Sequence, residues 1–132
     1  REVTVGVLEQ ECRNLIRRFI TFHTLHRPYI TLKWAESADR YIDNFREGGK
    51  PVILSNPLTS MLVHKKRAEH SAIMVGTRTA ELDNPGLTVR NWQGRSPVRI
   101  VIDRKQKLFP ELHLFDGNVR TLVCARTAIA IS

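Results

Sequence analysis

The chain has 132 residues, 42% of them hydrophobic, and its 21 lysines and arginines exceed 13 acidic residues, giving a formal net charge of +8. This composition suits one globular domain, and no window approaches the roughly 18–20 apolar residues of a membrane-spanning helix. The charge predicts an anionic partner such as a nucleotide, a phosphorylated metabolite or a nucleic acid. Cys12 and Cys124 lack CxxC or Cys/His spacing, so we expect no disulfide framework and no metal site. Glutamates near the N-terminus replace the apolar core of a signal peptide, which predicts a cytoplasmic protein.

The first part of the chain predicts one helix and two strands. Apolar residues recur at spacings of three and four over Val5–His26, which indicates a helix. Pro28 ends it, and alternation of apolar and polar residues predicts a strand over Tyr29–Ser37. Pro51–Leu54 is a second, shorter strand candidate.

A strand-helix-strand unit is expected next. Asn56 can cap a helix that starts at Pro57 and runs to about His70. The apolar run Ala72–Val75 then reads as an inner strand covered on both faces, parallel to Pro51–Leu54 through a right-handed crossover.

The rest of the chain predicts further strands. Leu82–Gly94 is irregular because it contains the turn sequence Asn-Pro-Gly. Val98–Ile102 is an apolar strand, and Leu112–Phe115 and Thr121–Ala125 are weaker candidates.

Polar side chains follow the strand Ala72–Val75. In open α/β sheets, ligands bind in the crevice beyond the carboxyl ends of the strands. We therefore expect a ligand site there, drawing on Thr77, Arg78, Thr79, Asp83, Asn84 and Arg90.

Four segments carry a family resemblance. EVTVGVLEQECRNL, RPYITLKWAESAD, ILSNPLTSMLVHKKRAEHSAIMVGTRTAELDNPGLTVR and SPVRIVIDR resemble the reductase domain of the bifunctional riboflavin-biosynthesis deaminase/reductase, the RibD C-terminal domain. The resemblance implies an α/β, dihydrofolate-reductase-like three-layer fold with a mostly parallel central sheet flanked by helices. It implies a single partial domain over residues 1–132, in which residues 1–26 form a helix leading in from an absent deaminase domain. It also implies that the C-terminal part of the reductase domain lacks a counterpart in these 132 residues.

The same resemblance implies an activity. The family is an NADPH-dependent oxidoreductase that reduces the ribose of 5-amino-6-(5-phosphoribosylamino)uracil to a ribityl chain. Carried over by position, Arg67 and Arg90 are ligands of the substrate and its phosphate, and Leu87 lines the same pocket. Arginine suits this role because its planar fork donates two parallel hydrogen bonds to a phosphate. Without the resemblance, Arg67 reads as a surface charge on a helix.

The cofactor and the proton donor are assigned in the same way. The resemblance implies that NADPH is bound by Ala35, Ile53, Thr79, Asp83 and Arg104, and that Lys33 contacts the sugar and supplies a proton. A salt-bridged structural lysine is the alternative for Lys33, and capping of the following turn is the alternative for Asp83. Arg104 or Arg78 would meet the adenosine 2′-phosphate. Arg40 departs from the family because it stands where glycine is usual, which costs free energy if the backbone there needs a positive φ.

Two other functions are left open. A basic nucleic-acid-binding module would use Arg13, Arg17 and Arg18, but only 7% of the residues are aromatic and no recognition motif is present. The second alternative is a non-catalytic dimerisation fragment of the same reductase family. Exposed sheet edges favour a homodimer in either case.

Overall fold

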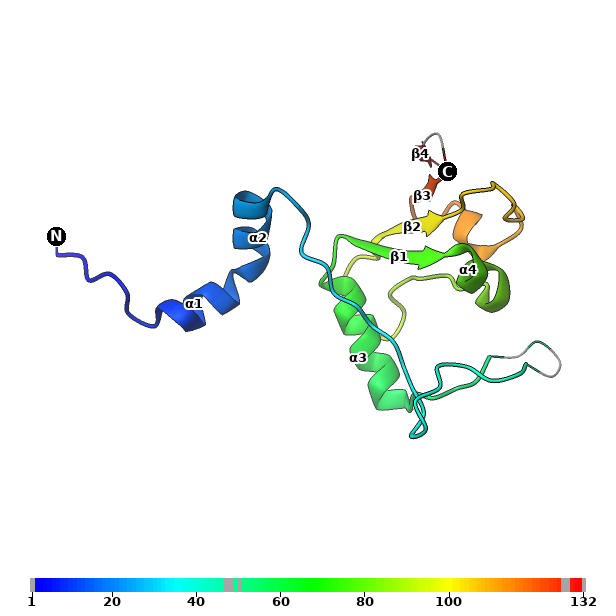
Figure 1. The fold of residues 1–132 in the computed structure, drawn as a ribbon, viewed down its shortest axis with the longest axis horizontal. Helices are drawn as coiled ribbons and strands as arrows, with labels where there is room; N and C mark the ends of the chain where they lie inside the picture. The colour runs from blue at the N-terminus through cyan, green and yellow to red at the C-terminus, as the bar shows by residue number, and fades with distance from the viewer. Residues whose placement is uncertain (1, 47–48, 50, 127–128, 132) are drawn as a thin grey trace. The chain divides into compact units, whose positions relative to one another are not determined.

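The computed structural model describes residues 2–46, 49, 51–126 and 129–131, and the chain divides into two compact units, Arg1–Trp34 and Ala35–Ser132. In Figure 1 the helices of the first unit are blue, and the sheet of the second unit runs from green to red. Within the described ranges, no helix is long and apolar enough to cross a membrane.

The first unit contains two short helices where the sequence predicted one. α1 (Glu9–Leu15) and α2 (Arg17–Leu25) are separated at Ile16, whose φ of −99° and ψ of 17° interrupt the helical backbone. Leu8 has a φ of 51°, in the left-handed region, so the helix begins after it. The continuous helix predicted for Val5–His26 is therefore wrong.

Two predicted strands are absent from the described residues. Tyr29–Ser37 and Pro51–Leu54 form no strand. An alternating pattern indicates which side chains one face of a strand would bury, but a strand also needs a neighbour for its backbone N–H and C=O groups. The sheet in this structure is built from other segments, so the crossover predicted between Pro51–Leu54 and Ala72–Val75 is also wrong.

The second unit opens with the helix that the sequence predicted best. α3 (Pro57–Ala68) begins directly after Asn56, whose side-chain oxygen accepts a hydrogen bond from the Thr59 backbone N–H at 2.8 Å. This bond satisfies one of the otherwise unpaired donors of the first turn. β1 (Ala72–Gly76) follows and leads directly into α4 (Thr77–Asp83).

The sheet has the strand order β1-β2-β3-β4. β2 (Val98–Ile102) lies parallel to both β1 and β3 (Thr121–Cys124), whereas β4 (Ile129–Ile131) lies antiparallel to β3. The mostly parallel sheet expected from the sequence is confirmed. The strand predicted at Leu112–Phe115 is wrong, because His113–Phe115 forms a 3-10 turn, η2, in which the Phe115 N–H bonds the Leu112 carbonyl at 2.8 Å.

The core lies around β2 rather than β1. The buried apolar side chains are Ala80, Leu87, Val101 and Leu114. β1 lies at the edge of the described sheet, and Met74 on it is 56% exposed. The prediction that Ala72–Val75 is covered on both faces is therefore wrong, because a strand with one described neighbour and one packed face leaves alternate side chains in solvent.

Candidate functional site

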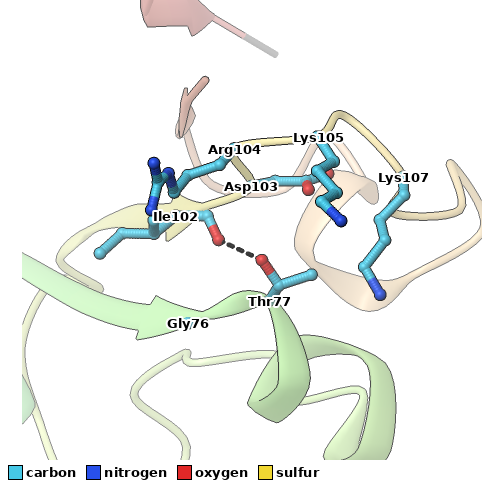
Figure 2. Close-up of a pocket in the computed structure, with 7 residues that line it drawn as sticks. All are labelled: Gly76, Thr77, Ile102, Asp103, Arg104, Lys105 and Lys107. Atoms are coloured by element: carbon cyan, nitrogen blue, oxygen red, sulfur yellow. Dashed lines mark hydrogen bonds between the residues drawn. The ribbon is translucent and has the colours of Figure 1, made fainter. Parts of the chain in front are cut away.

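A cavity of about 320 Å³ opens beyond the carboxyl ends of β1 and β2. Figure 2 shows its lining residues, which are Gly76, Thr77, Ile102, Asp103, Arg104, Lys105 and Lys107. Gly76 and Ile102 are paired in the parallel register, so both strands end at the same edge of the sheet. The Thr77 hydroxyl donates to the Ile102 carbonyl at 2.5 Å and joins the two strand ends. A crevice is present at the expected edge, and Thr77 is the one residue of the expected set that lines it; Arg78, Thr79, Asp83, Asn84 and Arg90 are not among its lining residues.

Asp103 is the buried acid of this cavity. It is 2% exposed, and its Oδ2 accepts the Leu108 backbone N–H at 2.9 Å. Its Oδ1 is buried and has no hydrogen-bond partner among the described residues. An unpaired buried carboxylate oxygen is costly, so a hydrogen-bond donor placed in the cavity would stabilise it.

Three of the lining residues are cations. Lys107 is paired with Glu81 at 2.9 Å. Arg104 and Lys105 have no ion pair in the described part of the chain, and their backbone follows Asp103 directly. The cavity thus combines two unneutralised positive charges with one acceptor, which suits a ligand that carries both a phosphate and hydroxyl groups.

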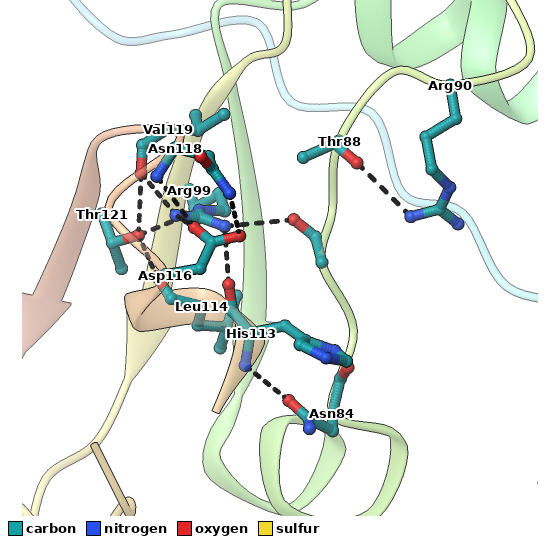
Figure 3. A network of polar contacts seen from close by, with 11 residues as sticks. Asn84, Thr88, Arg90, Arg99, His113, Leu114, Asp116, Asn118, Val119 and Thr121 are labelled. Carbon is teal, nitrogen blue, oxygen red and sulfur yellow. Dashed lines mark hydrogen bonds and ion pairs between the residues drawn. The ribbon is translucent and has the colours of Figure 1, made fainter. Parts of the chain in front are cut away.

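A second polar cluster lies where α3 meets the loop after α4. The Arg67 Nη1 donates to the Thr88 carbonyl at 3.0 Å, and the Arg90 Nη1 donates to the Thr88 hydroxyl at 3.3 Å, as Figure 3 shows for Arg90. The Arg90 backbone N–H donates to Nδ1 of His64 at 3.0 Å. Two arginines and a buried histidine therefore meet around Thr88.

The electrostatics of this cluster favour an anion. Burial, and after it the neighbouring Arg90, lower the pKa of the Arg67 guanidinium. The Arg67 Nε is buried without a hydrogen-bond partner among the described atoms. Two neighbouring guanidinium groups, one of which has an unused donor, make a good receptor for a phosphate.

The predicted substrate residues are only partly brought together. Arg67 and Arg90 share Thr88 as a partner. Leu87 instead points into the core, where it is 5% exposed, and its φ of 52° lies in the left-handed region. In this structure Leu87 positions the loop that carries Arg90 and does not line an open pocket.

The predicted cofactor residues are dispersed. Arg104 lines the cavity, whereas Thr79 is exposed on α4 and Ile53 is 87% exposed. The Asp83 carboxylate is bound by Arg46 at 2.6 Å, which is neither of the two roles considered for it. Ala35 is half-buried at the start of the second unit.

Lys33, the predicted proton donor, is an exposed residue of the first unit. Its role therefore stays a prediction.

Sequence reasoning missed two central residues. Asp103 follows the strand Val98–Ile102, so the rule that ligands bind beyond strand ends could have found it. His64 precedes Arg67 by three positions on the same helix, a spacing that places both on one face. Among the described residues, no three His, Cys, Asp or Glu side chains come together as a metal site.

The chain is similar to proteins of riboflavin biosynthesis. It is 40% identical over 103 residues to the riboflavin biosynthesis protein RibD of Aquifex aeolicus, covering 77% of this chain and 28% of that relative. It is 38% identical over 95 residues to the 2,5-diamino-6-ribosylamino-4(3H)-pyrimidinone 5′-phosphate reductase of Saccharomyces cerevisiae, covering 69% of this chain and 36% of the yeast protein.

A solved structure from Thermotoga maritima matches the fold. That protein is a diaminohydroxyphosphoribosylaminopyrimidine deaminase/5-amino-6-(5-phosphoribosylamino)uracil reductase, and it aligns with a TM-score of 0.81 and 37% sequence identity over 92% of this chain and 34% of its own. The chain thus spans about a third of the length of these relatives. They do not favour the nucleic-acid-binding alternative. The family model of the RibD C-terminal domain matches residues 28–131. This match, together with the shared fold, shows that the chain belongs to the RibD C-terminal domain family.

Proposed function

We propose that this chain is a reductase module that converts the ribose of 5-amino-6-(5-phosphoribosylamino)uracil to a ribityl chain with NADPH as the hydride donor. The names of the yeast and Thermotoga relatives support the reaction class and a substrate with a 5′-phosphate. The single observation that carries the proposal is the convergence of Arg67 and Arg90 on Thr88, with an unpaired buried donor on Arg67.

The arginine cluster serves the substrate phosphate. A phosphate dianion at Arg67 and Arg90 would offset the repulsion between two guanidiniums and accept the unused Nε–H. Binding energy from a phosphate that does not react can be used to orient the sugar carbon that does react.

The cavity beyond β1 and β2 serves the cofactor. NADPH carries a 2′-phosphate next to a ribose hydroxyl, and the lining residues fit this pair, since Arg104 and Lys105 are cations and the Asp103 Oδ1 needs a donor. The roles implied for Ala35, Ile53, Thr79 and Asp83 are retained as predictions. The first test for Asp83 is whether cofactor binding releases it from Arg46.

The chemistry divides between the cofactor and the chain. NADPH, when bound, would supply the hydride for C1′ of the opened, imine-like sugar, and the chain would have to deliver one proton to the ring oxygen that is released. We assign that proton to Lys33, which also binds the sugar hydroxyls. Lys33→Met should therefore lower kcat while leaving the KM for NADPH unchanged.

The experiment measures each ligand separately. We expect the purified chain to bind NADPH, and Arg104→Gln to weaken NADPH binding more than NADH binding, because NADH lacks the 2′-phosphate. Arg67→Gln and Arg90→Gln should each weaken substrate binding by roughly 10- to 100-fold, which is the value of a charge-assisted hydrogen bond. The affinity for NADPH should stay unchanged in both variants. Absence of both NADPH binding and substrate binding would refute the proposal. Oxidation of NADPH by the chain in the presence of substrate distinguishes a catalytic module from a non-catalytic fragment.

A homodimer and a cytoplasmic location are retained as parts of this proposal. The outer edge of β1 has no strand partner in the described sheet, and an unpaired edge favours association. Light scattering on the purified chain tests the dimer, and fractionation of cells tests the location.

A further inference from the structure

His64 is buried at the centre of the arginine cluster. It is 3% exposed, and it is the one buried residue of α3 within the described structure. Its Nδ1 accepts the Arg90 backbone N–H at 3.0 Å, which links the helix to the loop between α4 and β2. Because Nδ1 accepts a hydrogen bond from an amide, the ring proton of the neutral imidazole must be on Nε2.

The charges facing His64 are cationic. Arg67 faces it from its own helix and Arg90 faces it from the loop, and burial together with these two charges lowers the pKa of the imidazole. The backbone of Thr88 acts in the opposite direction. The ring is therefore neutral near pH 7, as acceptance of the Arg90 N–H requires.

Two hydrogen bonds from α3 determine where the Thr88–Arg90 segment lies. The Arg67 Nη1 bonds the Thr88 carbonyl, and the His64 ring bonds the backbone two residues later at Arg90. These two bonds, from one face of one helix, fix both ends of the Thr88–Arg90 segment. With the segment fixed, the Arg90 guanidinium lies against the Thr88 side chain, close to where Arg67 is held.

We propose that His64 is the positioning residue of the anion site, holding Arg90 beside Arg67 through its neutral Nδ1. This inference rests on the proposed function, in which the two arginines bind the substrate phosphate. Protonation of His64 replaces the Nδ1 acceptor by a donor that faces the Arg90 N–H, so it releases Arg90 from its position, and we expect this loss to outweigh the attraction of the added positive charge for an anion. Anion binding through this cluster therefore depends on pH.

The test uses inorganic sulfate, which stays a dianion over the range in which histidine titrates. Sulfate affinity of the wild-type chain should be constant above about pH 6.5, the ordinary histidine pKa, and fall below it. His64→Asn places a non-titrating acceptor near the position of Nδ1, so it should keep the affinity and lose the pH dependence. The other four of the five histidines are present in both proteins. The ratio of the wild-type affinity to the His64→Asn affinity at each pH therefore reports the titration of His64.

A second variant removes the acceptor. Above about pH 6.5, His64→Leu should bind sulfate about 3- to 10-fold more weakly than the wild type, the net value of one hydrogen bond, and the difference should narrow as wild-type His64 becomes protonated. Its Arg90 backbone amide should exchange with solvent faster than in the wild type, while circular dichroism stays unchanged.

Each outcome decides between the two proposals. Sulfate binding that is lost in Arg67→Gln and Arg90→Gln, yet has the same pH profile in the wild type and in His64→Asn, overturns the role of His64 alone. Wild-type protein that binds no sulfate counts against the arginine site of the proposed function. The role of His64 is then decided by Arg90 amide exchange, and equal exchange in the wild type and His64→Leu overturns it.

Discussion

The Arg99 guanidinium lies 2.8 Å from the Asp116 carboxylate, and the arginine side chain is completely buried. Its remaining donors are also used. They bond the Thr121 hydroxyl at 2.9 Å and the carbonyls of Gly86, His113 and Val119 (Figure 3). One side chain on β2 thus joins the loop before Leu87 to η2 and to the start of β3. The loop that carries Arg90 is therefore held at both ends, by Arg99 and by His64.

Removal of this side chain should destabilise the fold strongly. Arg99→Met leaves the Thr121 hydroxyl and the Asp116 carboxylate without their buried partner, and we expect a loss on the order of 3–5 kcal/mol in the free energy of unfolding. Denaturant titration measures it. Arg95→Met is the matched control, since Arg95 is exposed and should change stability by less than about 0.5 kcal/mol. Equal effects of the two substitutions would contradict the role given to Arg99.

Acid should act through Asp116. The hydrogen bond from Arg99, followed by those from the backbone and side chain of Asn118, lowers the pKa of Asp116 from 3.8 to about 2. A carboxyl whose pKa is lower in the folded state stabilises the fold above its unfolded pKa and loses that contribution as the pH falls through the folded pKa. Stability should decline between pH 3.8 and about 2, and Asp116→Asn should flatten that decline. An unchanged pH slope in the variant would assign acid unfolding to other groups.

Arg40 occupies a backbone position that suits glycine. Its φ is 67°, in the left-handed region, and its N–H donates to the Ser37 carbonyl at 2.9 Å within the turn. The positive φ costs a non-glycine residue roughly 1–2 kcal/mol of folding free energy. Glycine avoids this cost, but its larger conformational entropy in the unfolded state cancels part of the gain. Arg40→Gly should raise the free energy of unfolding by about 0.5–1 kcal/mol. Arg40→Ala, which keeps the positive φ penalty, should give no such gain in the same titration.

Gly94 allows a close approach between its loop and the end of α3. A Cβ at this position would lie 2.8 Å from the Cβ of Ala68, and φ is 132°. Gly117 is a matched control, because it also has a positive φ, 73°, but a Cβ there would meet nothing within 4 Å. Gly94→Ala should therefore cost about 2 kcal/mol more than Gly117→Ala in thermal or denaturant unfolding. It should also weaken sulfate binding, because the loop from Arg90 to Gly94 would move away from the helix.

The sequence predicted the elements whose signals are local. Asn56 followed by proline marks a helix start because a cap and a preset φ act within one turn, and α3 begins there. Val98–Ile102 is a mostly apolar run, and it forms β2, one of the two inner strands of the described sheet. The family and the fold class follow from motifs spread over most of the chain, and both are confirmed.

Elements that depend on a partner were predicted poorly. Tyr29–Ser37 has strand-like alternation and Pro51–Leu54 is a short apolar run, but neither has a strand neighbour in the described structure, and Ala72–Val75 lies at an edge. Pairing is a property of two segments, so no local pattern determines it. The site behaves in the same way, since Arg67 and Arg90 were predicted as a pair and share Thr88, while the burial of Leu87 in the core depends on segments far from it in the chain.

The sequence by itself therefore determined the chemistry of this protein, namely its cationic balance, its two arginines and the family to which they belong. The tertiary structure alone decided which groups work together. It left the Asp103 Oδ1 unpaired in a cationic cavity, buried Leu87 in the core, and placed the His64 ring against the Arg90 backbone. The physical reason is that burial and hydrogen-bond partnership arise from contacts between segments far apart in the chain, whereas residue type and local periodicity are written in each segment alone.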